Sequence, residues 1–121
     1  MEHDLQFEID FCQSILRRDA NNIPVMEMLA GFLTKSGRID EGLVLDQRIV
    51  ELDPDNAISH YNLACSLALK NRSSEALSAL RMALERGYDD FDWLMKDNDL
   101  VSLHEMPAFS ALVSEFRASN S

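Results

Sequence analysis

The amino-acid sequence predicts an all-α fold, a solenoid of helical hairpins, and three observations support this prediction. The sequence matches itself with a 34-residue period, which is typical of stacked helix–turn–helix units. Apolar residues within each unit recur at spacings of three and four, as they do on one face of a helix. Proline and glycine, which interrupt helices, number only three and four in the 121 residues. We predict one domain over residues 1–121, with a lone N-terminal helix, two full repeats and C-terminal capping helices.

The first predicted element is a helix over residues 5–20. Its opening stretch, LQFEIDFCQSIL, also alternates apolar and polar residues from Leu5 to Phe11, as a half-buried strand would. The 34-residue period decides for the helix, because it places Ile9 under Leu43 and Asp19 under Asp53. Residues 5–20 are therefore expected to fill the position of a repeat's second helix, as a half-repeat.

This helix has a second apolar stripe, formed by Phe7, Phe11 and Ile15. A second helix normally packs on the first helix of its own unit, and residues 1–4 are too few to supply one. Large aromatic side chains left in water commonly mark an interface. We predict that Phe7, Phe11 and Ile15 form an oligomer interface, in a homodimer or with a helix of another chain. The alternative is that the C-terminal segment or a frayed N-terminus covers them.

The two full repeats are predicted at residues 23–56 and 57–90. Large, small and charged residues agree between them in register; the pairs include Leu29 with Leu63, Ala30 with Ala64, Leu33 with Leu67, Arg38 with Arg72, and Glu41 with Glu75. In the second repeat, residues 71–74 separate two helices, and Ser73 or Ser74 is the expected N-cap of the second one. Gly87 is placed to end that helix.

The sequence repeat is lost after residue 90, because Leu63 and Ala64 would correspond to Asp97 and Asn98. We predict a closing cap over residues 91–121. It would contain a short helix near residues 90–96, a turn at residues 97–100, and a last helix that begins at Pro107, a favoured first-turn residue.

Composition and charge exclude several classes of function. A net charge of −10 without a basic patch argues against nucleic-acid or membrane partners, because phosphate groups would be repelled. The start of the chain lacks the pattern of a signal peptide, and no segment approaches the roughly 18 apolar residues of a membrane span. Cys12 and Cys65 are too far apart for a metal-binding motif and are expected to be buried free thiols. We predict a cytoplasmic protein.

No catalytic or cofactor motif is present in the sequence. His3, His60 and His104 stand singly, and His60 is expected to be a satisfied histidine at the edge of the core. The acidic residues between Asp89 and Asp99 do not fit an EF-hand loop, so they are expected to be helix caps and solvated charges. We therefore predict no catalytic residues, no metal site, no cofactor and no enzymatic activity.

The repeated residues resemble the tetratricopeptide repeat (TPR) family. The resemblance rests on Leu29-Ala30 with Leu33, on Glu41-Gly42-Leu43 and on ELDPDN at residues 51–56, and it continues through Leu63-Ala64 and Glu75-Ala76-Leu77. Asp46 departs from the pattern, because a large apolar residue is usual there. The C-terminal segment resembles the closing segment of some bacterial TPR arrays, which implies a bacterial origin.

This resemblance implies a protein–protein interaction module that binds a peptide or helix in a concave groove. By register, the groove would be lined by Glu27, Met28, Gly31, Ile58, Tyr61, Asn62 and Cys65. Alternatively, Tyr61 and Met28 only complete the packing between helices. The groove lacks the basic residues that grip the acidic tails of chaperones, so a basic or apolar partner is expected. Two other functions stay open: a small acidic TPR-type chaperone for a secreted client protein, and a regulatory domain of an enzyme complex.

Overall fold

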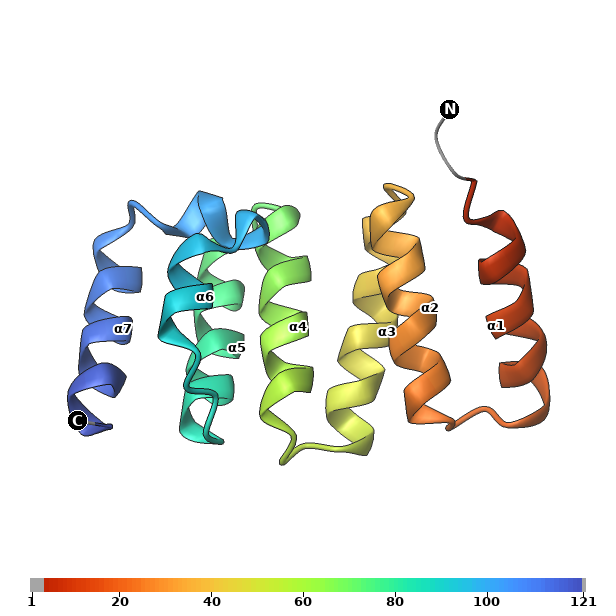
Figure 1. The fold of residues 1–121 in the computed structure, drawn as a ribbon, viewed down its shortest axis with the longest axis horizontal. Helices are drawn as coiled ribbons and strands as arrows, with labels where there is room; N and C mark the ends of the chain where they lie inside the picture. The colour runs from red at the N-terminus through yellow and green to blue at the C-terminus, as the bar shows by residue number, and fades with distance from the viewer. Residues whose placement is uncertain (1–3, 121) are drawn as a thin grey trace.

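The computed structural model describes residues 4–120, and it is all-helical over that range. Within this range, seven α-helices and one 3₁₀ helix, η1, follow one another along the chain: α1 (Gln6–Arg18), α2 (Ile23–Lys35), α3 (Ile39–Leu52), α4 (Ala57–Leu69), α5 (Ser73–Glu85), α6 (Phe91–Lys96), η1 (Asn98–Leu103) and α7 (Pro107–Ser119). The helices form a row with α1 at one end and α7 at the other (Figure 1). No helix in the described range is long and apolar enough to cross a membrane.

The N-terminal stretch is a helix, so the strand interpretation of residues 5–11 is wrong. Ile9 and Cys12 are buried in α1, where they pack with Leu29 and Leu33 of α2. The alternation from Leu5 to Phe11 arises because α1 carries apolar residues on two sides. One side joins the core, whereas Phe7 and Phe11 on the other side are 77% and 56% exposed.

The 34-residue period is visible in the turns between helices. The backbone N–H of Asp19 donates to the Ile15 carbonyl, and the N–H of Asp53 donates in the same way to Ile49. The Asn22 amide bonds the Asp19 carboxylate, and Asn56 bonds Asp53 identically at 3.2 Å. The turn after α1 is therefore built like the turn after α3, as the register of the two segments predicts.

The tight turns inside the two hairpins also correspond. Gly37 has a φ of 81°, and Asn71, at the same position of the next repeat, has a φ of 59°. Glycine and asparagine are the residues that tolerate this left-handed conformation. The prediction that Ser73 or Ser74 caps α5 is wrong, since the N-cap is Arg72, which makes no side-chain cap bond. Arg72 instead pairs with Glu75, a residue in the first turn of the helix.

The 34-residue period continues into the C-terminal segment, although the sequence match ends there. The helices α2, α4 and α6 begin at residues 23, 57 and 91, and α3, α5 and α7 begin at residues 39, 73 and 107. The C-terminal segment thus has the spacing of a third hairpin whose first helix is interrupted. The interruption lies at Asp97, which adopts an extended conformation and caps η1. The sequence analysis predicted a turn at residues 97–100. In the structure these residues are the N-cap and the first part of η1.

Two apolar cores hold the described part of the row together. The smaller one joins α1, α2 and α3 and includes Ile9, Leu29 and Leu33. The larger one extends from α3 to α7, and there Leu94, Leu100, Leu103 and Phe109 are fully buried. Because η1 contacts α4 and α7 contacts α5, the C-terminal segment is fixed against the second hairpin.

Candidate binding cleft

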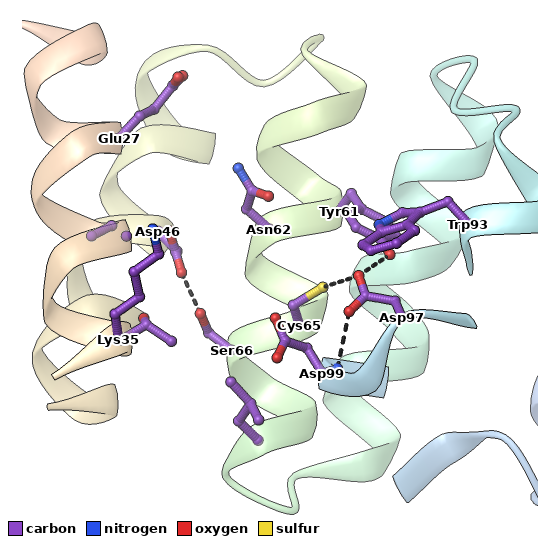
Figure 2. A pocket seen from close by; sticks show the side chains of 14 residues that line it. Glu27, Lys35, Asp46, Tyr61, Asn62, Cys65, Ser66, Trp93, Asp97 and Asp99 are labelled. Atoms are coloured by element: carbon purple, nitrogen blue, oxygen red, sulfur yellow. Dashed lines mark hydrogen bonds between the residues drawn. The ribbon is translucent and has the colours of Figure 1, made fainter. Parts of the chain in front are cut away.

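A cleft with a volume of about 320 Å³ opens on the face shared by α2, α4 and the segment from α6 to η1 (Figure 2). Five of the residues expected to line a groove do line it: Glu27 and Gly31 from α2, and Tyr61, Asn62 and Cys65 from α4. These positions lie on the first helices of the two hairpins, and both helices contribute to the cleft. The volume is in the range of cavities that hold ligands or side chains.

Met28 and Ile58 do not line this cleft, which differs from the predicted groove. Met28 follows Glu27 and is therefore turned about 100° around α2, so that its side chain is exposed. Ile58 lies one turn before Asn62, nearer the start of α4, and is likewise exposed. Both residues offer apolar surface outside the cleft.

Gly31 leaves the α2 wall of the cleft open. A Cβ atom added at Gly31 would meet no atom within 4 Å. By contrast, a Cβ at Gly42 of α3 would lie 2.7 Å from the Thr34 hydroxyl and 3.2 Å from the Ala30 carbonyl. Gly42 therefore permits close packing of α2 and α3, whereas Gly31 leaves space for a ligand.

Tyr61 combines packing with a place in the cleft wall. Its ring stacks on Tyr88 with centroids 4.3 Å apart, and its hydroxyl donates a 2.5 Å hydrogen bond to the Asp97 carboxylate. The Cys65 thiol donates to the same carboxylate oxygen at 3.8 Å. Burial, followed by the hydrogen bond to Asp97, raises the pKa of the Tyr61 hydroxyl. Burial and the nearby Asp97 also raise the pKa of the Cys65 thiol.

A second buried acid, Asp46, lines the cleft from α3. Only 6% of Asp46 is exposed, and its carboxylate accepts a 2.5 Å hydrogen bond from the Ser66 hydroxyl of α4. Burial raises the pKa of the Asp46 carboxyl to about 6, and the charge of Glu27 adds to this shift, while the Ser66 hydrogen bond opposes it. Asp46, which stands where the repeat pattern usually has a large apolar residue, is thus a buried acid that lines the cleft.

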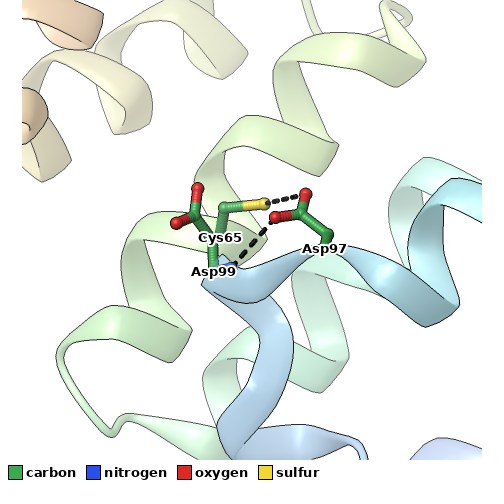
Figure 3. A group of neighbouring side chains, drawn as sticks. All are labelled: Cys65, Asp97 and Asp99. Carbon is green, nitrogen blue, oxygen red and sulfur yellow. Dashed lines mark hydrogen bonds between the residues drawn. The ribbon is translucent and has the colours of Figure 1, made fainter.

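Cys65, Asp97 and Asp99 form a cluster that sequence reasoning did not assemble. Their possible ligand atoms lie within 4.8 Å of one another (Figure 3). The prediction that the acids of this segment are caps or solvated charges is confirmed, since Asp90 and Asp97 are N-caps and the other acids are exposed. Asp97 does cap η1 by accepting from the Asp99 N–H at 3.0 Å, but it is buried. Burial and the neighbouring Asp97 raise the pKa of the Asp99 carboxyl.

The cluster has the residue types of a metal site, but its thiol is protonated and its buried carboxylate is already hydrogen-bonded. Metal binding by cysteine requires the thiolate, and the raised pKa of Cys65 favours the protonated thiol. Both oxygens of Asp97 already accept hydrogen bonds from within the protein, namely from Tyr61, Cys65 and the Asp99 backbone.

A signal for Asp99 was present in the sequence. Gly31, Cys65 and Asp99 occupy the same position in successive 34-residue units, and all three line the cleft. Extending the register through the point where the residue types stop matching would have placed Asp99 there. Trp93, the remaining aromatic residue of the lining, comes from α6 and is 51% exposed. It has no counterpart in the earlier repeats, so no pattern in the sequence pointed to it.

The two histidines within residues 4–120, His60 and His104, are not part of the cleft lining. His60 is buried, and its ring lies 2.7 Å from the Pro54 carbonyl, to which it donates, so it is a satisfied histidine as expected. The His104 ring contacts the Leu94 carbonyl at 3.3 Å. His3 lies outside the residues that the structure describes.

Comparison with known proteins supports the repeat architecture. A family profile described as tetratricopeptide repeat matches residues 47–78. The chain is also similar to a chloroplastic protein of Arabidopsis thaliana, with 32% identity over 86 residues, which cover 69% of this chain and 26% of that protein. The matched region thus spans about a quarter of the relative's length. The repeated hairpins and the match over residues 47–78 together support the resemblance of this chain to the tetratricopeptide repeat.

Proposed function

We propose that this chain is a non-enzymatic interaction module that binds a peptide or helical segment of another protein in the cleft. The observation that carries this proposal is that α2, α4 and the α6–η1 segment contribute jointly to one cavity of about 320 Å³. Members of the tetratricopeptide repeat family generally bind other proteins. The open wall at Gly31 and the exposed Trp93 supply the space and contact area that such a segment needs.

The acidic tail of a chaperone is a poor fit for this cleft. Glu27, Asp46, Asp97 and Asp99 all line it, against a single basic residue, Lys35. An acidic segment would meet like charges there and would be repelled.

The test is to fill the cleft without disturbing the core, by Gly31→Phe. We expect this variant to lose at least about tenfold in affinity for any peptide selected from a random display library by the parent chain, because its ring occupies the ligand's volume. The measurement is calorimetric titration of both proteins with the synthetic peptide. Ser78→Phe on the exposed side of α5 is the matched control and should bind normally. Equal affinity of Gly31→Phe and the parent would move the binding site away from this cleft.

We also propose that α1 provides a second contact surface, through which the chain associates with a second copy. The supporting observation is the exposure of Phe7 and Phe11 on one side of α1, beside the partly buried Ile15. Water-exposed aromatic side chains of this size favour burial in an interface. The helix also stands at one end of the row, where no other described helix blocks access (Figure 1).

Light scattering tests this self-association. The parent chain is expected to form dimers at micromolar concentration, and Phe7→Asp/Phe11→Asp is expected to be monomeric, because the charged pair would be buried in the interface. Val44→Asp/Val101→Asp removes two other exposed apolar residues and should remain dimeric. If the parent is itself a monomer, the α1 surface does not serve self-association.

The predicted bacterial origin and cytoplasmic location stay predictions. The relative from Arabidopsis thaliana is named as a chloroplastic protein, and that description belongs to the relative. Binding of a protein segment by the cleft does not depend on the compartment.

A further inference from the structure

We infer that the cleft receives a basic side chain, lysine or arginine, from the bound partner segment. This inference rests on the proposed function, because it identifies the chemistry of the residue that enters the same cleft. It is carried by the acids that line the cavity, by the absence of counter-ions for them within residues 4–120, and by the aromatic side chains beside them.

The lining is strongly acidic, and within residues 4–120 the one basic side chain that lines it is Lys35. Four acids, Glu27, Asp46, Asp97 and Asp99, line the cleft together with Lys35. Among residues 4–120, no arginine or lysine forms an ion pair with any of these four acids; five basic residues pair instead with Asp40, Glu41, Glu75, Asp92 and Glu115. A cationic ligand would therefore find an excess of negative charge here.

Two of these acids are buried on either side of the cleft. Asp46 and Asp97 are 6% and 7% exposed, and the groups that donate hydrogen bonds to them are hydroxyl, thiol and backbone N–H groups without charge. A buried carboxylate without a cation is costly, and a cation placed nearby lowers that cost. The Asp97–Asp99 pair also places two acids next to each other, so a cation between them relieves their repulsion.

Aromatic side chains complete the surroundings that a lysine or arginine prefers. Trp93 and Tyr61 both line the cleft, and Figure 2 shows them on the same side as Asp97. Among aromatic side chains, tryptophan is the strongest partner for a cation placed over its face. The aliphatic stem of a lysine or arginine can pack on such a ring while its charged end reaches the acids.

A side chain fits this cleft better than a bare metal ion does. The cavity of about 320 Å³ is large enough for a long side chain and is far larger than a single ion. The oxygens of Asp97 and the thiol of Cys65 are already engaged with each other and with Tyr61. Asp99, which is exposed at the cleft, is accessible to an incoming ammonium or guanidinium group.

The experiment starts from a random library of displayed twelve-residue peptides, selected on the parent chain and counter-selected on Gly31→Phe. Bound peptides are expected to share a lysine or arginine at one position. Replacing that residue by neutral norleucine in the synthetic peptide should weaken binding by about tenfold or more. Trp93 is the only tryptophan of the chain, so its fluorescence reports directly on the occupancy of the cleft.

A variant of the exposed acid tests the pairing itself. Asp99→Asn should weaken binding of the basic peptide by about tenfold. It should leave binding of the norleucine peptide nearly unchanged, because the norleucine substitution has already removed the interaction that Asp99 makes with the basic side chain. Asp55→Asn removes one negative charge from an exposed turn outside the cleft and should have less than about a twofold effect. Circular dichroism of both variants verifies that they are folded.

The other results are distinguishable. The selected peptides could lose binding to Gly31→Phe and yet share no basic residue. This result would overturn the inference and would remain consistent with the proposed function. A selection that yields no peptide sensitive to Gly31→Phe would overturn both. Quenching of Trp93 by micromolar Zn²⁺ or Ca²⁺ alone, lost in Asp99→Asn, would show a metal site in place of a site for a basic side chain.

Discussion

Two buried aspartates define the chemistry of this molecule at the scale of single residues. Asp46 meets Ser66 between α3 and α4, and Asp97 meets Tyr61 between η1 and α4. Both stand where an apolar residue would pack more favourably, since ionised groups are seldom buried without a cation. Residues that lower stability in the free protein and face a cleft are typical of binding sites.

The raised pKa of Asp46 predicts a specific dependence of stability on pH. Its folded-state value of about 6 exceeds the ordinary value of 3.8, so the folded protein binds a proton more tightly than the unfolded chain does. The free energy of unfolding should therefore fall as pH rises from about 4 to 6, by roughly 2–3 kcal/mol from this group, and the cost remains above pH 6.

Asp46→Asn tests this dependence. The amide oxygen can still accept from Ser66, so the variant should be more stable than the parent by about 2 kcal/mol at pH 7.5 and should lose most of that advantage at pH 4. Urea denaturation at the two pH values measures the difference. Asp55→Asn, an exposed control, should change stability by less than about 0.5 kcal/mol. An Asp46→Asn variant no more stable than the parent at pH 7.5 would contradict the cost assigned to this carboxyl.

At the scale of helices, the two glycines that lie inside the helices of the first hairpin have opposite roles. Gly31 lies in α2 with free space around its Cα, and Gly42 lies in α3 against Thr34 and Ala30. Glycine inside a helix costs about 1 kcal/mol relative to alanine. A glycine-to-alanine substitution removes that cost only where the added methyl group does not clash with neighbouring atoms.

Alanine substitutions at these two positions should therefore differ. Gly31→Ala is expected to raise the free energy of unfolding by about 0.5–1 kcal/mol, whereas Gly42→Ala should gain nothing or lose stability, because its Cβ would displace α2. Thermal and urea unfolding of the two variants compare them directly. A larger gain at Gly42 than at Gly31 would show that the approach of α2 and α3 is not tight at this glycine.

Much of the helix arrangement could be predicted from the sequence, because the 34-residue period fixes helix, turn and helix in each hairpin. The second-helix position of α1 and the start of α7 at Pro107 followed from that period and from turn chemistry. The N-cap of α5 was mispredicted because the Arg72–Glu75 pair takes the place of a serine cap. The short helix and the break after it in the C-terminal segment were predicted, but the 3₁₀ helix η1 was not. Its cap, Asp97, is held by tertiary contacts with Tyr61 and Cys65, which lie far back along the chain in α4.

The candidate site was predictable only in part, for the same reason. The register of the repeats correctly placed five residues in the cleft lining: Glu27, Gly31, Tyr61, Asn62 and Cys65. It could not exclude Met28 and Ile58, because their exclusion depends on how far around and along each helix the cleft extends. Trp93 and Asp97 come from the segment where residue matching fails. Their position in the cleft follows from the docking of η1 on α4, a contact that no local pattern encodes.

At the scale of the whole molecule, the row of helices carries an acidic cleft and an exposed aromatic stripe. The cleft lies where the two hairpins meet the C-terminal segment, and the stripe lies on α1. Helix α1 stands at one end of the row (Figure 1). The larger core supports the cleft from behind through α4, α5 and α7, so the cleft wall is fixed before a ligand arrives. The two surfaces are separate, which allows one chain to bind a partner segment and a second copy at once.

The most direct test of the central claim is to map a library-selected peptide onto the ¹⁵N-labelled chain by nuclear magnetic resonance. We expect the largest chemical-shift changes at the amides of Gly31, Asn62 and Asp99 and at the Trp93 indole N–H, with little change along α1. Changes concentrated around Phe7 and Phe11, with the cleft resonances unmoved, would contradict the claim that the cleft is the partner-binding site.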